Sequence, residues 1–344
     1  MEKPPFVSVI VLNHDGYKFI RPCLSSLIKT DYPNFEIIFV DSLSTSQSAQ
    51  EAERSLKNFP RHKIIASQES LGWSGGNNLG LKNARGEIIA FLSNDTEVDP
   101  LWLKELVGVL TSKPEIGIVQ AKSLAIFDKK TLDSGKNYVD VFGFCYSETP
   151  SQKPEEVFFA EGVAFALKKE VLDKIGLFDQ DFIIMYDDID LSWRARLAGF
   201  KVMIAPSSVV FHHRGGTVGE GILKIKPAIV YLNVRNHLTS LLKIYERKNL
   251  WLYLPPVIAA QFIKAFLFLF VHRQTKAAAA VMRGLFSLIK NRREIIKKRQ
   301  GVQKTRSITD REIKKAMVKF SPRLLLNIFR TRKTLGAQIL EKKD

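Results

Sequence analysis

The sequence predicts an α/β fold, with a doubly wound and mostly parallel sheet, followed by a basic helical region. Short apolar runs rich in β-branched residues alternate with helical patterns through residues 1–217. The net charge changes sharply along the chain. Residues 1–220 hold 24 Lys and Arg against 29 Asp and Glu, whereas residues 221–344 hold 28 against 6. We therefore expect a mildly acidic domain at residues 1–217 and a strongly basic region at residues 218–344.

Strands are expected where short apolar runs end at turn residues, and helices where apolar residues recur every three to four positions. The expected strands cover residues 6–12, 36–41, 63–66, 87–92 and 209–211. The expected helices cover residues 19–28, 47–57, 75–83 and 187–198, with a further helix beginning near Pro100. Residues 120–160 are expected to be a loop-rich insertion, because they contain Gly135, Gly143, Pro150 and Pro154.

Polar side chains follow three of the expected strands, at Asn13, Asp41 and Asp95. Ligands of doubly wound sheets bind at the carboxyl ends of strands. Asp95 ends the segment Ser93-Asn94-Asp95, which either caps the next helix or forms a D-x-D-like turn that binds Mg²⁺ or Mn²⁺. His212 and His213 end another apolar run, as a plain polar strand end or as the imidazole partner in a metal site.

Three acids, Asp187, Asp188 and Asp190, lie within four residues at an expected helix start. The helix dipole favours one or two acids at such a position. Three acids exceed that need and raise each other's pKa, which suits a general base. The glycine-rich stretch 71–78 matches neither G-x-G-x-x-G nor a Walker loop, and is either flexible or a helix start whose N–H groups approach a diphosphate. Asp41 is either a turn residue or an acceptor for a nucleobase N–H.

Together these segments resemble the family 2 glycosyltransferases of the GT-A fold, and among them the bacterial branch of rhamnosyl- and galactofuranosyltransferases of polysaccharide assembly. The resemblance extends over residues 6–217. It is carried by residues 7–13, 37–41, 71–80, 92–98, 160–162, 175–179, 187–194, 197–200 and 212. The chain departs from the family pattern at Ser93, at Asp187 where Glu is usual, and at Ser42-Leu43-Ser44 after Asp41.

The resemblance implies an inverting transfer of a sugar from a UDP- or dTDP-linked donor to a hydroxyl of a glycan or lipid-linked acceptor in cell-surface polysaccharide synthesis. Asp41 would bind the nucleobase, Asn77 the ribose–phosphate region, and Asp188 would be the base, with Asp187 and Asp190 beside it. Asp95 and His212 would hold a divalent metal, Mn²⁺ or Mg²⁺. The implied nucleotide-sugar-binding residues are Asn13, Asp41, Gly75, Gly76, Asn77, Asn94 and Asp95. The alternative is a membrane-docked nucleotide-binding pseudoenzyme that acts as a scaffold without turnover.

The basic region contains an apolar stretch, residues 251–271, that is long enough to cross a bilayer. Lys264 within it costs about 2.5–3.5 kcal/mol on insertion scales, and Pro255-Pro256 predicts that the helix breaks early. The stretch is therefore an interfacial or re-entrant segment, a single span, or a buried helix of a soluble core. The cations adjoin apolar stretches rather than stacking aromatics, which favours an anionic membrane over nucleic acid. We expect the protein at the cytoplasmic face of the inner or plasma membrane, with Cys23 and Cys145 as free thiols.

Overall fold

The computed structural model describes residues 3–14, 16–43, 46–213 and 226–320. The chain forms two compact units, which we call the sheet unit and the helical unit. The sheet unit comprises Met1–Asn137, Ser147–Arg214 and Thr305–Ile308, and the helical unit comprises Tyr138–Tyr146, Gly215–Lys304 and Thr309–Asp344. The units thus exchange short segments, whereas the sequence predicts one boundary at residue 217, which lies outside the described residues.

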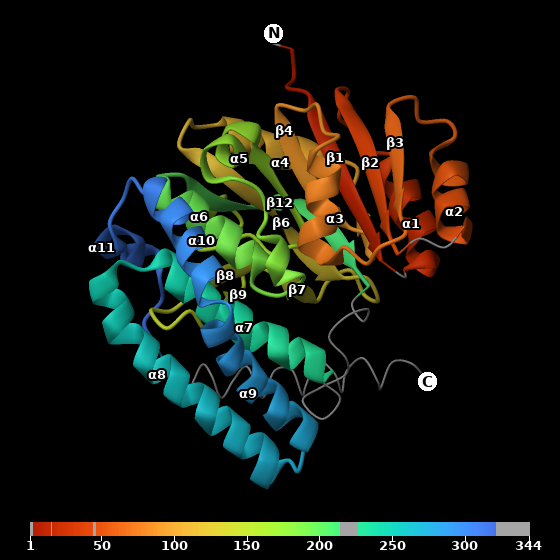
Figure 1. Ribbon diagram of the computed structural model, residues 1–344. Helices are drawn as coiled ribbons and strands as arrows, with labels where there is room; N and C mark the ends of the chain where they lie inside the picture. Colours follow the sequence, from red (N-terminus) through yellow and green to blue (C-terminus); the bar gives the residue numbers. More distant parts are fainter. Residues whose placement is uncertain (1–2, 15, 44–45, 214–225, 321–344) are drawn as a thin grey trace. The chain divides into compact units, whose positions relative to one another are not determined.

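The sheet unit is built on a mixed sheet, ten-stranded in the described part of the chain (Figure 1). Its strands are β1 (Val7–His14), β2 (Phe35–Ser42), β3 (His62–Ser67), β4 (Ile88–Ser93), β5 (Thr96–Val98), β6 (Ile116–Ala125), β7 (Leu132–Ser134), β10 (Glu155–Glu156), β11 (Ala164–Lys168) and β12 (Lys201–His212). They lie in the order β10-β12-β6-β11-β4-β1-β2-β3, with β5 beside β12 and β7 beside β6. Strands β3, β2, β1 and β4 are parallel, as are β6 and β12, and β11 runs antiparallel between β4 and β6.

Helices cover both faces of this sheet, so its strands are apolar on both sides. They are α1 (Tyr17–Leu27), α2 (Ser46–Leu56), α3 (Gly72–Leu81), α4 (Trp102–Thr111), α5 (Lys169–Ile175), the 3₁₀ turn η1 (Gln180–Phe182) and α6 (Asp187–Leu197). Val9 of β1 packs into the core with α1, α2 and α4, whereas its neighbour Ile10 packs into the core with α5 and α6. The predicted doubly wound α/β fold is confirmed.

Two central strands, β6 and β11, are absent from the sequence-based prediction. The expectation of a loop-rich insertion at residues 120–160 is wrong for β6, which continues to Ala125, and for the short strands β7 to β10. The polar residue Gln120 interrupts the apolar pattern of β6, so the sequence does not indicate this strand. Gln120 is nevertheless buried, because its side chain is fully hydrogen-bonded. The Gln120 side chain donates to Gly135 O at 2.9 Å and accepts from Asn137 Nδ2 and the Glu161 N–H, each at 3.0 Å.

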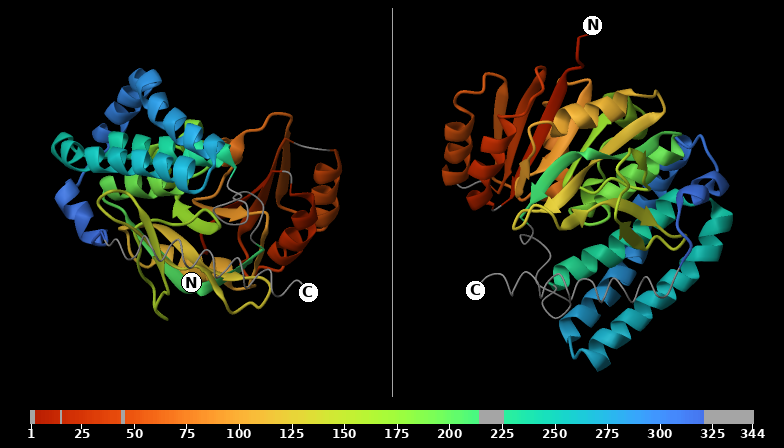
Figure 2. Two further views of the ribbon diagram at one scale, coloured as in Figure 1. Left: turned by 90° about the horizontal axis from the view of Figure 1, so that it is seen from below. Right: turned by 180° about the vertical axis from the view of Figure 1, so that it is seen from behind.

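The helical unit contains α7 (Pro227–Ile244), α8 (Arg247–Phe266), the π-helical turn η3 (Leu267–Val271), α9 (Thr275–Lys290), α10 (Arg292–Lys304), α11 (Asp310–Ile313) and the 3₁₀ turn η4 (Lys314–Ala316). Figures 1 and 2 show α7, α8 and α9 packed beside one another. The hairpin of β8 (Lys136–Val139) and β9 (Cys145–Glu148) anchors its tip on α7. There the Tyr245 hydroxyl donates to Val141 O, and His237 Nε2 lies 2.7 Å from Phe142 O.

The expected helix break at Pro255-Pro256 is wrong, because α8 runs through both prolines to Phe266. Both prolines are on the exposed side of the helix, whereas Val257, Gln261 and Ala265 form the buried stripe. A bend away from the packed side relieves the clash between a proline ring and the preceding turn without disturbing that stripe. Tertiary packing therefore overrides the local preference.

Close packing of α3 on β1 gives a test of the fold. A Cβ added at Gly80 would lie 2.5 Å from Cγ2 of the buried Ile10, whereas a Cβ at Gly108 in α4 would meet nothing within 4 Å. We expect Gly80→Ala to lower the free energy of unfolding by about 1–3 kcal/mol through overpacking. Gly108→Ala should raise it by about 0.5–1 kcal/mol through helix propensity. Urea titration measures both, and an equal effect of the two substitutions would contradict the packing.

Candidate active site

Three neighbouring strands end in a chain of buried amide and carboxylate groups. Asn94 Nδ2 donates to Asn13 Oδ1, and Asn13 Nδ2 donates to Asp41 Oδ1 at 2.7 Å. The parallel register pairs Asn13 directly with Asp41, so the two side chains emerge together. Asp41 is 1% exposed, and its Oδ2 has no hydrogen-bond partner among the described residues. A buried carboxylate oxygen without a donor is costly, and a ligand N–H would satisfy it.

Asp95, His212 and Asp133 meet at the end of β12. His212 Nε2 lies 3.2 Å from Asp95 Oδ2, and His212 Nδ1 lies 2.9 Å from Asp133 Oδ2. The sheet dictates the first contact, because His212 pairs with Thr96 across β12 and β5, and His213 N–H donates to Asp95 O. Asp133 is the site residue that the sequence does not reveal, since it belongs to β7 within the stretch expected to be loops.

Both nitrogens of His212 therefore face a carboxylate. Asp133, which also accepts from Ser123 Oγ at 2.8 Å, fixes the ring through Nδ1 and leaves Nε2 directed at Asp95. Burial raises the pKa of Asp95, but the hydrogen bonds and charge of His212 and the Ser93 hydroxyl outweigh burial and hold it below its usual value. Ser93 thus bonds to Asp95 at the position where D-x-D motifs have a second acid. His213 instead contacts Glu97 at 3.3 Å, which separates it from His212.

The pair Asp95–His212 fits a divalent cation. Two ligands at right angles around an ion with bonds of about 2.1 Å lie about 3 Å apart, which is close to the separation observed here. An imidazole whose other nitrogen donates to a carboxylate is the usual protein ligand for such ions. Across residues 3–14, 16–43, 46–213 and 226–320, no group of three or more His, Cys, Asp or Glu forms a complete metal site. The remaining ligands would therefore come from bound substrate or water.

Asp188 and Asp187 open α6 with perturbed carboxyl groups. Burial raises the pKa of Asp188 to about 6, although its two carboxylate oxygens accept the N–H groups of Gly162 at 3.0 Å and Ile189 at 2.8 Å. Burial and the charge of Asp188 raise the pKa of Asp187 well above its usual range. Asp188 is partly exposed whereas Asp187 is buried, so Asp188 is the acid that a substrate can reach.

Backbone contacts bring Asp188 near the end of β4. The Gly162 that binds Asp188 is followed by Val163, whose carbonyl accepts the Ser93 N–H at 2.9 Å. The neighbouring N–H groups of Ala160 and Glu161 are held by Ser192 of α6 and by Gln120. This network explains why Ala160-Glu161-Gly162 accompanies the acidic helix start.

Asp190, which belongs to the predicted catalytic set, has surroundings that differ from those of Asp187 and Asp188. Its side chain is fully buried, and its Oδ2 accepts from Arg194 Nε at 2.8 Å, one helical turn away. The guanidinium of Arg194 also donates to the carbonyls of Ile175 and Leu177. The pair of Asp190 and Arg194 therefore ties α6 to the segment before η1.

The glycine-rich segment also differs from expectation. Helix α3 begins at Gly72, three residues before the expected start, and the N–H groups of Trp73 and Ser74 donate to Ile183 O at 2.6 and 3.1 Å. Those two N–H groups are thereby occupied rather than presented to a diphosphate. Gly75 and Gly76 lie inside the helix, where a Cβ at Gly76 would lie 2.4 Å from Leu12, and Asn77 is buried with its amide donating to Trp73 O.

The backbone before α6 is strained. Ile183, Met185 and Tyr186 have φ values of 61°, 73° and 64°, in the left-handed region that these side chains disfavour. The Ile183 carbonyl is the acceptor for the start of α3, and Gly72 with φ 64° allows that close approach. The strained segment thus joins the glycine-rich helix to the acidic helix. The apolar run Ile183-Ile184-Met185 gives no indication in the sequence that its backbone is strained.

Ser42 is the first of the three residues after Asp41 at which the chain departs from the family pattern, and its side chain has a local structural role. Its Oγ accepts the Leu71 N–H at 2.9 Å, which ties the end of β2 to the residue before α3. Leu43 has a φ of 63°, and Ser44 lies outside the described residues. The Cys23 and Cys145 thiols are free, as expected.

Comparisons with known proteins show a similarity to glycosyl transferases. Residues 8–176 match the family Glycosyl transferase family 2. The O-antigen biosynthesis protein RfbC of Myxococcus xanthus is 30% identical over 230 residues, which is 62% of this chain and 18% of that protein. The chain spans only 26% and 18% of the first two curated relatives that it matches.

Solved structures share the fold at low sequence identity. GalNAc-T7, solved with UDP, GalNAc and Mn²⁺, has a TM-score of 0.60 at 17% identity and covers 72% of this chain and 49% of its own. The mannosyltransferase PcManGT from Pyrobaculum calidifontis, solved with GDP-Man and Mn²⁺, has a TM-score of 0.54 at 18% identity and covers 83% and 88%. The chain therefore has a GT-A fold, and its residues 8–176 are similar to the family Glycosyl transferase family 2.

Proposed function

We propose that the protein is an inverting glycosyltransferase that moves a sugar from a nucleotide-diphospho donor to a hydroxyl of a glycan or lipid-linked acceptor in cell-surface polysaccharide synthesis. The observation that carries the proposal is the raised pKa and partial exposure of Asp188 beside the end of β4, where Asp95 and His212 form their pair. The relative named for O-antigen biosynthesis supports the polysaccharide setting. The finer assignment to rhamnosyl or galactofuranosyl transfer rests on the sequence resemblance alone.

The nucleobase site is argued from Asp41. Its buried Oδ2 lacks a donor, while Asn13 holds Oδ1 and fixes the carboxylate plane. Uracil and thymine both offer an N3–H that would complete this acceptor, so UDP- and dTDP-sugars are the proposed donors. Asn94 orients Asn13 and therefore acts on the base through that side chain. The amide of Asn77 already donates to Trp73 O. The proposed role of Asn77 at the ribose–phosphate region is therefore supported only by its position in α3.

A divalent metal, Mn²⁺ or Mg²⁺, would be held by Asp95 and His212, and would offset the negative charge that develops on the departing diphosphate. Its presence in the GalNAc-T7 and PcManGT structures supports this choice. Asp133 and Ser123 keep the His212 ring in the orientation that presents Nε2.

The proposed reaction is a single displacement. Asp188 takes the proton from the acceptor hydroxyl, and the acceptor oxygen forms a bond to the anomeric carbon of the sugar. The bond from that carbon to the diphosphate oxygen breaks, and its electron pair leaves with the nucleoside diphosphate. Attack opposite the leaving group inverts the anomeric configuration. Burial and the charge of Asp188 raise the pKa of Asp187, which favours its neutral form and reduces the repulsion that a second ionised carboxylate would bring.

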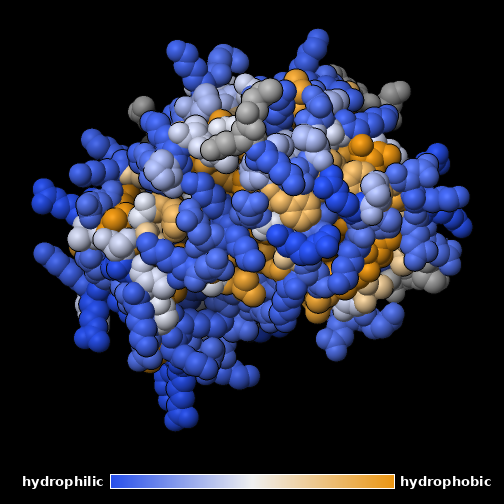
Figure 3. All heavy atoms as spheres, turned by 90° about the horizontal axis from the view of Figure 1, so that it is seen from above, coloured by the Kyte–Doolittle hydropathy of each residue, from blue (hydrophilic) through white to orange (hydrophobic). Residues whose placement is uncertain are grey.

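We further propose that the helical unit places the enzyme on the cytoplasmic face of the membrane. By length and composition Arg247–Val271 is apolar enough to cross a bilayer, and 22% of its apolar window is buried. Trp251, Phe266 and Phe270 are 82%, 56% and 64% exposed, in contrast with the face drawn in Figure 3, where hydrophilic residues predominate. An exposed apolar face this large favours a lipid partner over a buried core helix.

The position of Lys264 favours an interfacial helix. Burial, with a smaller contribution from the charge of Lys264, lowers the pKa of His237 in α7 to about 4, so Lys264 faces the packed side of α8. The buried Gln261 lies on that side too. One side of α8 is thus packed and includes two polar side chains, while the other is apolar and exposed, as is expected of a helix that lies in the plane of a membrane surface.

The pH dependence of transfer tests Asp188. A general base must be ionised, so kcat/KM should rise with pH through about 6, the pKa of Asp188, and then level off.

Asp188→Asn should lose about 10²–10⁴ in rate while donor affinity stays within a few-fold. Asp173→Asn, which alters an exposed acid in α5, is the matched control. Release of nucleoside diphosphate from UDP- and dTDP-sugars measures the rate. Wild-type turnover by Asp188→Asn would refute the base assignment, and donor binding without transfer by the wild type would favour the scaffold.

Metal affinity tests the role of Asp133. Asp133→Asn removes the charge that orients His212, and should weaken Mn²⁺ binding by about 10- to 100-fold. Ser123→Ala should weaken it less, because it removes one hydrogen bond to Asp133. Asp31→Asn, at an exposed acid, is the control. Electron paramagnetic resonance of free Mn²⁺ measures binding without any donor or turnover. An unchanged affinity in Asp133→Asn would show that Asp133 does not support the metal site.

Vesicle binding tests the membrane placement. The ring centroids of Phe266 and Phe270 lie 4.7 Å apart, and both side chains are exposed. The double change Phe266→Ser, Phe270→Ser should weaken binding to phosphatidylglycerol vesicles at least about tenfold, since each buried aromatic side chain contributes about 1.5–3 kcal/mol. High salt should release only the electrostatic part. Leu101→Ser, Leu177→Ser, exposed on the sheet unit, is the matched control. Cosedimentation decides, and equal binding by both doubles would rule out this face.

A further inference from the structure

Trp73, in the first turn of α3, packs against the backbone that supports Asp188. Its six-membered ring faces Gly162, where an added Cβ would lie 3.0 Å from Cζ2 and 3.4 Å from Cε2 of the indole. The N–H of the same glycine donates to Asp188 Oδ2 at 3.0 Å. A single glycine therefore separates the indole from the proposed base, and the absence of a Cβ there makes room for the ring.

Two buried phenylalanine rings hold the indole in place. The centroids of Trp73 and Phe178 lie 5.0 Å apart with the rings at 84°, an edge-to-face contact, and the Phe91 centroid lies 6.5 Å from Trp73. The backbone of Trp73 is fixed as well, because its N–H donates to Ile183 O at 2.6 Å. A side chain held in this way loses little conformational freedom when a ligand binds to it.

The indole N–H of Trp73 is an unused hydrogen-bond donor. Within the described part of the chain Nε1 has no partner, yet it is not sealed from solvent, so a ligand can reach it. The Trp102 indole in the core, by contrast, donates to Thr30 Oγ1 at 3.0 Å. Nε1 is bonded to Cε2, one of the ring atoms that face Gly162. The free donor therefore lies on the side of the ring nearest the support of Asp188.

The same backbone leads from the proposed base to the metal pair. Gly162 is followed by Val163, whose carbonyl accepts the Ser93 N–H at 2.9 Å, and the Ser93 hydroxyl donates to Asp95. In the proposed reaction the transferred sugar lies between the base, which activates the acceptor, and the metal, which binds the departing diphosphate. Trp73 therefore contacts the stretch of backbone along which that sugar would lie.

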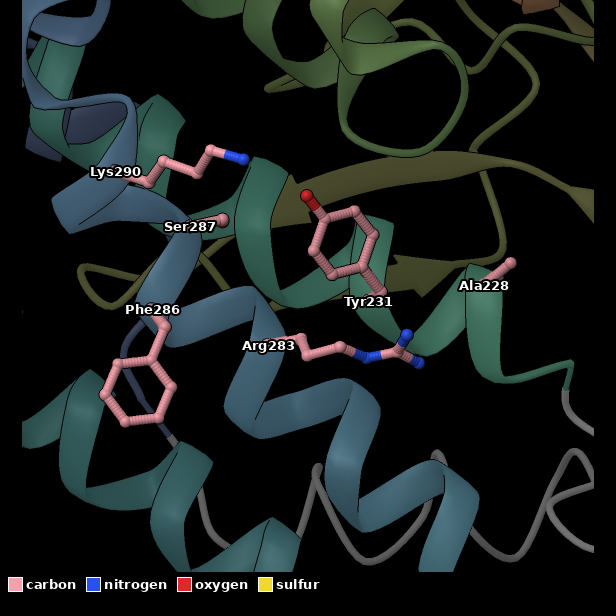
Figure 4. A pocket seen from close by; sticks show the side chains of 6 residues that line it. All are labelled: Ala228, Tyr231, Arg283, Phe286, Ser287 and Lys290. Carbon is pink, nitrogen blue, oxygen red and sulfur yellow. The ribbon is translucent and has the colours of Figure 1, made fainter.

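Aromatic side chains also line a groove of about 570 Å³ between α7 and α9 in the helical unit (Figure 4). There the Phe286 and Tyr231 rings stand on different sides of α9, and the Arg235 guanidinium lies 5.3 Å from the Tyr231 ring centroid. These rings do not share one face, and they belong to a different unit from Asp188. Trp73 is in the same unit as Asp188 and contacts its support.

We propose that Trp73 is a binding and specificity residue for the transferred sugar, and that its indole N–H donates to a hydroxyl oxygen of that sugar. The inference rests on the proposed function and specifies one contact within it. A sugar offers the chemistry that an aromatic ring with one donor recognises, namely an apolar C–H surface and acceptor oxygens. The contact selects sugars that carry a hydroxyl at this position, because a sugar without it leaves the donor unpaired.

Binding of nucleotides with and without the sugar tests the proposal. Calorimetry with Mg²⁺ compares UDP and dTDP with UDP-glucose, UDP-N-acetylglucosamine and dTDP-rhamnose. Trp73→Phe keeps an aromatic ring and removes the donor, and it should weaken the best-bound sugar-linked nucleotide by about 2- to 10-fold, the effect of one lost hydrogen bond. Its affinity for UDP or dTDP alone should be unchanged. Trp102→Phe, which removes an indole N–H bonded inside the fold, should lower the Tm and leave all these affinities unchanged.

Nuclear magnetic resonance of the indole N–H groups gives a second measurement, made on the wild-type fold. The four tryptophans of the chain give four signals after labelling with ¹⁵N-Trp, and the signal missing from Trp73→Phe belongs to Trp73. This signal should move downfield when the sugar-linked nucleotide is added. It should stay in place with the nucleotide alone, because only the sugar brings a new acceptor.

The outcomes separate a sugar contact from a structural or nucleotide contact. Equal losses of nucleotide and sugar-linked nucleotide affinity in Trp73→Phe would overturn the proposal. An unchanged affinity for every sugar-linked nucleotide, or an indole signal that moves equally with both ligands, would also overturn it. None of these measurements uses sugar transfer. A protein with the selective loss but no transfer would contradict the proposed reaction and leave the Trp73 contact standing, whereas transfer with equal losses would do the reverse.

Discussion

The parallel ladder that joins β1 to β2 and β4 is the constraint on which the candidate site depends. Its register pairs Asn13 with Asp41 and Leu12 with Ser93, so polar groups from three strands emerge at one edge. Side chains alternate between the two cores, and a slip of one residue would turn Asn13 toward the opposite face and bury it among apolar residues. The amide chain from Asn94 to Asp41 exists only in this register. Backbone pairing therefore determines the chemistry available at the edge.

The sheet unit gathers acids at this edge while holding them in different states. His212 and Ser93 keep Asp95 ionised, whereas burial holds Asp187 and Asp188 toward their neutral forms. Asp190 is neutralised by Arg194 instead. Like acids thus lie in distinct surroundings, which supports the proposed roles of Asp95 as a metal ligand and of Asp188 as a base. The helical unit carries the opposite charge, with few acids among many Lys and Arg, and its apolar helix faces outward.

Much of the fold is readable from the sequence, because β1 to β4 and their helices follow clear apolar periods. The elements that escape prediction have polar residues in buried positions. Gln120 interrupts the pattern of β6, and its bonding partners Asn137 and Glu161 are distant in sequence. Asp133 is hidden for the same reason, since only the folded sheet brings it to His212. The start of α3 and the continuity of α8 through its prolines depend on tertiary contacts, with Ile183 O in one case and the packed stripe in the other.

Residues 305–308 belong to the sheet unit although they follow the helices of the other unit. There the Ser307 N–H donates to Leu197 O at 2.7 Å, which satisfies a carbonyl at the end of α6. During synthesis from the N-terminus, the acidic helix therefore remains uncapped until more than a hundred further residues have emerged. The sheet unit therefore cannot finish folding before residues 305–308 are synthesised, and its last contacts form after the apolar helices are made. Chain connectivity thereby sets the order in which these parts of the protein become complete.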